Sequence, residues 1–161
     1  MQTWDVGGPV PRGLEDLLGV LWPQETGEVA AGQDSRTVIC LGPSDWLVLD
    51  EELHALTLVT ELNGAMAETN YRGTDVSQAL LRMQISGNAA CAVLGKGSSL
   101  DFDTKAFGVG RARRTRLAGI PVAVWRVGSD VFECLLTRSY GEYFHAWLED
   151  AALEFEGANR P

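Results

Sequence analysis

Three cysteines and two histidines are the first side chains to consider as nucleophiles, general bases or metal ligands in this sequence. Cys40, Cys91 and Cys134 each lie in an apolar stretch without Cys-x-x-Cys spacing, which predicts neither a disulfide framework nor a zinc site. Only Cys91 is expected near a helix N-terminus, where a thiolate is stabilised. His54 and His145 lie far apart, outside any Ser-His-Asp, Cys-His or metal-ligand spacing. The sequence therefore predicts structural thiols and no catalytic constellation.

Two further motifs have the composition of a ligand site but lack its context. Gly95-Lys96-Gly97 has the residue types of a phosphate loop, yet it follows a predicted helix, whereas a phosphate loop precedes one. These glycines are expected to end that helix. Asp101 and Asp103 alternate along the chain, but no second cluster of ligands supports a metal ion there.

Arginine is concentrated in one predicted strand, at Arg111, Arg113, Arg114 and Arg116. In a strand, Arg111 and Arg113 share one face, and Arg114 and Arg116 share the other. A buried sheet face cannot hold unpaired guanidinium groups, so this strand is expected at an edge or beside a ligand groove. Two interpretations stay open: a docking patch for an acidic partner or polyanionic tail, and a solvated edge strand in an acidic protein.

Aromatic residues recur at helical spacing near the C-terminus, at Tyr140, Tyr143, Phe144 and Trp147. His145 lies within this stripe. Aromatic stripes of this kind are typical of a packed core or of a protein interface. The stripe therefore does not predict a cofactor site.

The overall charge excludes several classes of partner. The chain has 161 residues, with 22 acidic and 13 basic ones, and a formal net charge of -9 at pH 7. Nucleic acids and anionic membranes both require a positive face, so neither is expected as a partner. No apolar run reaches the roughly 18 residues of a membrane span, and the N-terminus lacks the pattern of a signal peptide. Together with the unpaired thiols, this favours a cytoplasmic protein.

The elements that position these residues are clearest between residues 74 and 152. Alternating apolar residues, helical spacing and turn formers such as Gly87 and Gly128 predict the order β-α-β-β-β-α. The predicted elements are a strand at 74–87, a helix at 88–97, strands at 110–117, 120–127 and 131–137, and a helix at 138–155.

The first half predicts a related but shorter set. The expected elements are a helix at 11–21 ended by Pro23, a polar loop at 24–35, a strand at 36–41, a turn at 42–45, a strand at 46–49, and a helix with Leu53, Leu56, Val59 and Leu62 ended by Asn63-Gly64. Strand, turn, strand and helix thus follow one another in both halves, with Ser-Asp in both turns.

This recurrence predicts an internal duplication. The expected fold class is α+β: two pseudo-repeated β-α-β-β-α units with antiparallel sheets on one side and packed helices on the other. We expect a single domain with halves of about 1–70 and 71–152. A short polar tail at 153–161 would follow.

Several short motifs occur in a characteristic order, most clearly from Thr74 onward. They are Asp75-Val76-Ser77, Ser86-Gly87, Lys96-Gly97, Leu100-Asp101, Gly110-Arg111 with Thr115, and Arg138-Ser139-Tyr140. By their order and spacing, residues 36–152 resemble the gamma subunit of heterotetrameric sarcosine oxidase. More distantly, they are similar to the folate-binding fold of the glycine-cleavage T-protein, the aminomethyltransferase family.

The resemblance implies an accessory chain in a four-subunit flavoenzyme that demethylates sarcosine, passing the one-carbon unit to tetrahydrofolate and electrons to oxygen. It also implies that FAD, FMN, NAD and tetrahydrofolate are held by the other subunits, and that the partners are large alpha and beta subunits and a small delta subunit. The folate-using relatives carry an acidic pair where this sequence has Ile120-Pro121-Val122. An apolar segment cannot steer a cationic transfer, so aminomethyl transfer by this chain is not expected.

A subunit of this kind needs a sizeable apolar surface for its partners. The candidate interface residues are Arg111, Arg113, Trp125, Tyr140, Tyr143, Phe144 and Trp147. Two other functions stay open beside the sarcosine oxidase subunit or its counterpart in a sister N-methyl amino-acid dehydrogenase: a free-standing folate-binding module, and an interaction domain without a ligand. Folate titration and co-purification with flavoprotein subunits separate these functions.

Overall fold

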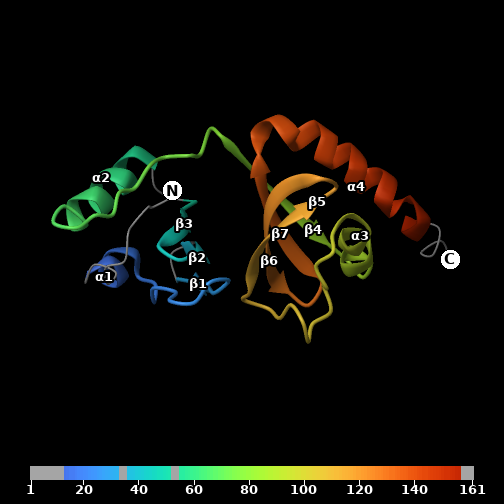
Figure 1. The fold of residues 1–161 in the computed structure, drawn as a ribbon, viewed down its shortest axis with the longest axis horizontal. Coiled ribbons are helices and arrows are strands. Elements are labelled where there is room, and N and C mark those ends of the chain that lie inside the picture. Colours follow the sequence, from blue (N-terminus) through green and yellow to red (C-terminus); the bar gives the residue numbers. More distant parts are fainter. Residues whose placement is uncertain (1–12, 33–35, 52–54, 157–161) are drawn as a thin grey trace. The chain divides into compact units, whose positions relative to one another are not determined.

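The computed structural model describes residues 13–32, 36–51 and 55–156. The chain divides into two compact units, Met1–Gln78 and Ala79–Pro161. Each unit combines helices with an antiparallel sheet (Figure 1). The predicted α+β class is therefore confirmed. The boundary lies some residues beyond the expected position near residue 70.

The first unit contains a three-stranded sheet in the order β1-β2-β3. Its elements are α1 (Leu14–Leu18), β1 (Val29–Ala31), β2 (Thr37–Gly42), β3 (Asp45–Leu49) and α2 (Ala55–Ala65). The predicted hairpin of β2 and β3 is confirmed, and Ser44 in its turn adopts a left-handed conformation with φ 58°. The predicted loop at 24–35 is wrong in part, because Val29–Ala31 pairs with β2.

Both helices of the first unit end elsewhere than predicted. Gly19, with φ 63°, ends α1 two residues before Leu21, which is left 81% exposed. Pro23 therefore does not end this helix. Asn63-Gly64 does not end α2, which continues to Ala65. Leu53 and His54 lie within residues 52–54, outside the described residues.

The core of the first unit lies between α1, α2 and the sheet. Leu18, Val38 and Leu62 are buried there. An aromatic group closes this core: the Trp46 ring lies 5.4 Å from that of Trp22 and 5.8 Å from that of Tyr71. Hydrophobic burial of this kind stabilises a small unit more than its hydrogen bonds do.

The second unit follows the predicted order β-α-β-β-β-α. Its elements are β4 (Leu80–Ser86), α3 (Ala90–Gly97), β5 (Ala112–Leu117), β6 (Ile120–Gly128), β7 (Val131–Thr137), the short 3-10 helix η1 (Arg138–Tyr140) and α4 (Gly141–Glu156). The sheet order is β4-β7-β6-β5, with all neighbours antiparallel. The strand predicted at 74–87 begins only at Leu80. Helix α4 continues to Glu156 and so includes four residues assigned above to a tail.

Helices α3 and α4 lie together against one face of this sheet (Figure 1). Alternation along β6 directs Val122 and Val124 into that face, as period-two patterning requires. Phe144 of α4 is fully buried among them and stacks on Trp147, with ring centroids 6.0 Å apart. None of the helices within the three described ranges is both long and apolar enough to cross a membrane.

Candidate partner interface

The three thiols lie in packing positions. Cys40 and Cys134 are buried, and burial raises the pKa of both thiols, that of Cys134 to about 12. Cys91, the second residue of α3, is half-buried and lies 3.6 Å from the Phe102 carbonyl oxygen. Free, uncharged thiols of this kind act as small apolar groups in a core.

Among the described candidates, His145 and the Asp101–Asp103 pair each contact a neighbour in the chain. His145 is exposed on α4, with Nδ1 3.5 Å from the Glu149 carboxylate one turn later. Asp101 accepts the Asp103 N–H at 2.8 Å, so this pair shapes the loop after α3. Among the residues that the structure describes, no three His, Cys, Asp or Glu side chains gather to hold a metal ion.

Gly95-Lys96-Gly97 forms the last turn of α3, and Ser98 follows as its C-cap. The helix therefore includes the glycines that were predicted to end it. Lys96 Nζ donates to the Ala151 carbonyl at 2.5 Å and contacts the Glu154 carboxylate at 2.7 Å. The lysine thus ties α3 to α4 and has no phosphate-loop geometry.

Gly97 is required by helix packing. A Cβ built on it would lie 2.6 Å from two ring carbons of Trp147 and 2.9 Å from the backbone nitrogen of Ala118, whereas one on Gly95 would meet nothing within 4 Å. We expect Gly97→Ala to lower the free energy of unfolding by about 1 to 3 kcal/mol through overpacking. Gly95→Ala, the matched control, should raise it by up to about 1 kcal/mol. Urea unfolding of both variants measures this, and equal effects would contradict the assignment.

The arginine-rich strand β5 is an edge strand, as predicted. Arg114 and Arg116 are exposed, whereas Arg113 is half-buried and lies opposite Val124 on the helix-covered face. Arg111 precedes the strand and is also half-buried, and its carbonyl accepts the Arg126 N–H at 3.0 Å. The cluster therefore lies around one edge of the sheet and does not form one continuous surface.

The aromatic candidates separate into buried and exposed residues. Trp125 and Phe144 are buried, and Trp147 is partly buried against Gly97. Tyr140 and Tyr143 are 41% and 53% exposed. Of the predicted aromatic set, these two tyrosines contribute the most accessible surface.

Arg126 is a buried charge that the sequence analysis missed, although it follows the inward alternation of Val122 and Val124. Its Nη1 donates to the carbonyls of Phe102 at 3.0 Å and Phe107 at 2.9 Å. Its Nε donates to the Gly128 carbonyl at 3.1 Å, and its Nη2 donates to the Ser129 carbonyl. The guanidinium also lies 5.0 Å from the Phe132 ring centroid. One side chain thus holds the 98–111 loop and the β6–β7 turn.

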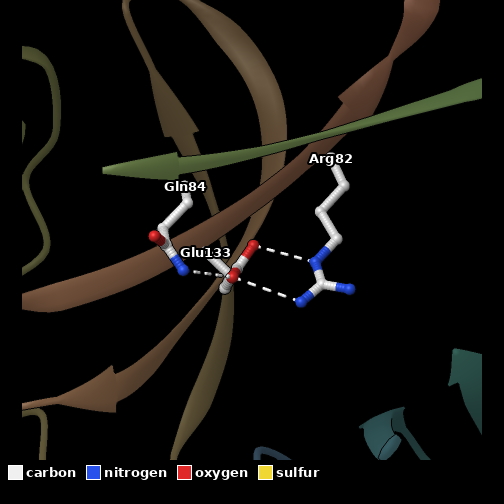
Figure 2. Close-up of polar contacts among 3 residues, drawn as sticks. All are labelled: Arg82, Gln84 and Glu133. Atoms are coloured by element: carbon white, nitrogen blue, oxygen red, sulfur yellow. Dashed lines mark hydrogen bonds and ion pairs between the residues drawn. The ribbon is translucent and has the colours of Figure 1, made fainter. Parts of the chain in front are cut away.

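A second buried charge, Glu133, lies on the sheet face opposite to Arg126. Figure 2 shows its contacts with Arg82 and Gln84. Arg82 of β4 donates to both of its carboxylate oxygens, at 2.9 and 3.2 Å, and the Gln84 amide donates at 3.0 Å. The Arg82 guanidinium carbon also lies 6.0 Å from the Trp125 ring centroid. Glu133 has neighbours from two strands in register, a relationship that no local sequence pattern reveals.

The motifs that carry the family resemblance have structural roles. Asp75 accepts the N–H and hydroxyl of Ser77, and these hydrogen bonds lower its pKa. The hydroxyls of Thr115 and Ser98 form a hydrogen bond of 2.9 Å. Gly87 adopts φ 119°, a conformation that favours glycine, directly after β4.

The described residues thus form a mixed α+β protein in which Arg126, Glu133 and Lys96 contact groups of the chain itself. The sequence matches the sarcosine oxidase, gamma subunit family over residues 11–154, and the chain belongs to this family. It is 38% identical to the sarcosine oxidase subunit gamma of Corynebacterium sp. (strain U-96) over 145 residues, which cover 90% of this chain and 70% of that protein. It is 37% identical to that of Arthrobacter sp over 88% of this chain and 69% of the relative.

The fold is also similar to that of a solved chain. In the heterotetrameric sarcosine oxidase from Corynebacterium sp. U-96 in complex with pyrrole 2-carboxylate, one chain matches with a TM-score of 0.87 and 35% identity. The match covers 96% of this chain and 78% of that one. The family predicted from the order of the motifs is therefore confirmed.

Proposed function

We propose that this chain is the non-catalytic accessory subunit of a heterotetrameric sarcosine oxidase, bound to alpha, beta and delta subunits. That complex would demethylate sarcosine to glycine and pass the one-carbon unit to tetrahydrofolate. FAD, FMN, NAD and tetrahydrofolate would lie in the other subunits, and the predicted cytoplasmic location belongs to the same proposal. The observation that carries it is the match over 96% of this chain to a chain of the solved heterotetramer.

The strand start that distinguishes this chain from folate-using relatives supports an accessory role. Ile120 and Val122 are buried in the core of the second unit, packed with α3 and α4. A carboxylate at either position would have to lose its hydration without a partner, which costs several kcal/mol. Both positions therefore support packing and do not supply a carboxylate for aminomethyl transfer.

Within this proposal, the candidate interface residues reduce to those with accessible surface. Tyr140, Tyr143 and Trp147 retain accessible aromatic surface, and Arg111 and Arg113 lie half-buried near the β5 edge. Tyrosine and arginine are enriched in the energetically important parts of interfaces. Trp125 and Phe144 would support this surface from within, because both are buried in the chain.

The predicted duplication also remains a proposal, but the repeated unit differs from the predicted β-α-β-β-α order. In each unit a helix is followed by three consecutive antiparallel strands and a second helix: α1-β1-β2-β3-α2 and α3-β5-β6-β7-α4. Two units of this order are compatible with an aminomethyltransferase-like fold whose halves make one domain. Strand β4 is then an addition to the second unit.

Co-expression of this chain with the proposed alpha, beta and delta subunits tests the proposed function. We expect this chain to elute in size-exclusion chromatography with a yellow complex that absorbs near the flavin bands. Omitting the chain from the co-expression is the control and should alter the size or yield of that complex. Elution of the chain alone and colourless would contradict the proposal, and tetrahydrofolate binding by the isolated chain would then support a folate-binding module.

A further inference from the structure

The outer side of β4 has the backbone geometry of a docking edge. Among the described residues, β4 pairs with β7 alone. The Gly87 N–H donates to the Asp130 carbonyl at 3.0 Å, in continuation of that register. Hydrogen-bonded positions alternate in antiparallel pairs, so the odd-numbered residues of β4 face β7. The backbone N–H and C=O groups of Arg82, Gln84 and Ser86 therefore point away from β7.

Beside this edge, the helix-covered side of β4 is hollowed. A groove of about 500 Å³ adjoins Leu81, and one of about 440 Å³ adjoins Ile85. Both are lined by Met83 and His145, so they adjoin along the strand. The side chains of Leu81, Met83 and Ile85 are only partly buried against the core. Alternate residues of an added strand would extend into this apolar groove.

The two edges of the sheet differ in protection. Edge strands usually carry charges that prevent pairing with other chains. Strand β5 carries exposed Arg114 and Arg116. Arg82 is the one charged side chain of β4. It forms an ion pair with Glu133 on the sheet face opposite to the groove. The Arg138 guanidinium covers only the start of the β4 edge, where it donates to the Leu80 carbonyl at 3.1 Å. From Met83 to Ser86, strand β4 therefore lacks the charged protection that β5 has.

The groove also has a charge that indicates its occupant. The groove beside Leu81 is lined by both Glu142 and Arg138, whose charges offset each other. The groove beside Ile85 is lined by Glu149, which is exposed on α4 and gives that end an acidic character. A second copy of this chain would bring the same carboxylates, and a net charge of -9, against them. A segment with lysine or arginine beside its apolar residues is complementary.

We propose that β4 binds an extended segment of another subunit of the oxidase complex, added as a further strand of the sheet. This segment alternates apolar residues toward Met83 and Ile85 and carries a basic residue toward Glu149. The inference rests on the proposed function, because it requires a partner subunit. It adds which surface of this chain is used and the chemistry of the bound segment.

Two variants test the backbone and charge contributions separately. Ser86→Pro removes an outward N–H and spares the β7 ladder, a position where edge strands tolerate proline. Glu149→Lys reverses the charge at the groove, and Asp150→Lys makes the same change one residue further along α4, outside both grooves. Each untagged variant is co-expressed in competition with the tagged wild-type chain and the other subunits. The ratio of the two chains in the flavin-containing peak is then measured.

We expect Ser86→Pro and Glu149→Lys each to be incorporated about tenfold less than the wild-type chain, and Asp150→Lys equally. Hydrogen exchange should show slower exchange of the Gln84 and Ser86 amides in the complex than in the isolated chain. Incorporation of both variants at the wild-type ratio, or unchanged amide exchange, would overturn the docking proposal alone. Dimers of the isolated chain with the same amide protection would overturn it in favour of a second copy. If the wild-type chain itself does not elute with flavin, the proposed function fails and the docking proposal fails with it.

Discussion

Replacing Arg126 with methionine is expected to lower the free energy of unfolding by about 3 to 5 kcal/mol, a large fraction of the stability of a small protein. The guanidinium donates to four backbone carbonyls while it is only 2% exposed. Methionine fills part of the volume but donates nothing, so these buried carbonyls lose their partner. Urea unfolding followed by tryptophan fluorescence measures the loss.

Arg126→Met is also expected to destabilise one particular segment of the chain. Two of the carbonyls, those of Phe102 and Phe107, belong to the loop between α3 and β5. Limited proteolysis of Arg126→Met should therefore cut within residues 98–111 well before the wild-type chain is cut there. Arg126→Lys should recover part of the stability. Arg116→Met, which removes an exposed arginine, is the control and should cost under about 1 kcal/mol. A cost as small for Arg126→Met would show that the guanidinium is not the anchor of this loop.

Removing Arg82 is expected to cost more than removing Arg82 and Glu133 together. The Glu133 side chain is 4% exposed, whereas that of Arg82 is 39% exposed, so Arg82→Met leaves a carboxylate in a buried position with Gln84 as its remaining partner in this group. Breaking one side of a buried pair leaves an uncompensated charge. Solvent reaches the arginine, so we expect about 2 kcal/mol for Arg82→Met, below the value for a fully buried pair.

A double-mutant cycle measures this expectation directly. Arg82→Met with Glu133→Leu should regain at least about 1 kcal/mol relative to Arg82→Met, because no charge is left buried. Arg116→Met, on the opposite edge strand β5 and outside both grooves and the Arg82–Glu133–Gln84 group, is the control. Additive losses in the cycle would show that the two side chains do not depend on each other. The same variants, once folded, should still enter the complex, which separates stability from docking at β4.

The element order of the second unit could be predicted from the sequence because its signals are local. Val122, Val124 and Arg126 alternate along one strand, and Gly128 marks the turn that follows, so neighbouring residues alone carry the information. The order and spacing of short motifs likewise predicted the family. The predictions were wrong where the local pattern was short or ambiguous. The three-residue strand Val29–Ala31 was assigned to a loop, and α1 was expected to reach Leu21 although Gly19 ends it.

Which side of each element is covered was decided only by the tertiary structure. The aromatic stripe of α4 has one helical spacing, yet Phe144 is buried and Tyr143 is exposed, since α3 and the sheet cover only one side of the helix. Arg126 can be buried because carbonyls such as that of Phe102, 24 residues earlier in the chain, accept hydrogen bonds from its guanidinium. Strand β4 lies at the sheet edge because β7 pairs on its other side. Residues remote in the chain supply these contacts, so the sequence by itself determined the elements and the family. Among the described residues, the fold determined which faces are buried and which strands lie at the sheet edges.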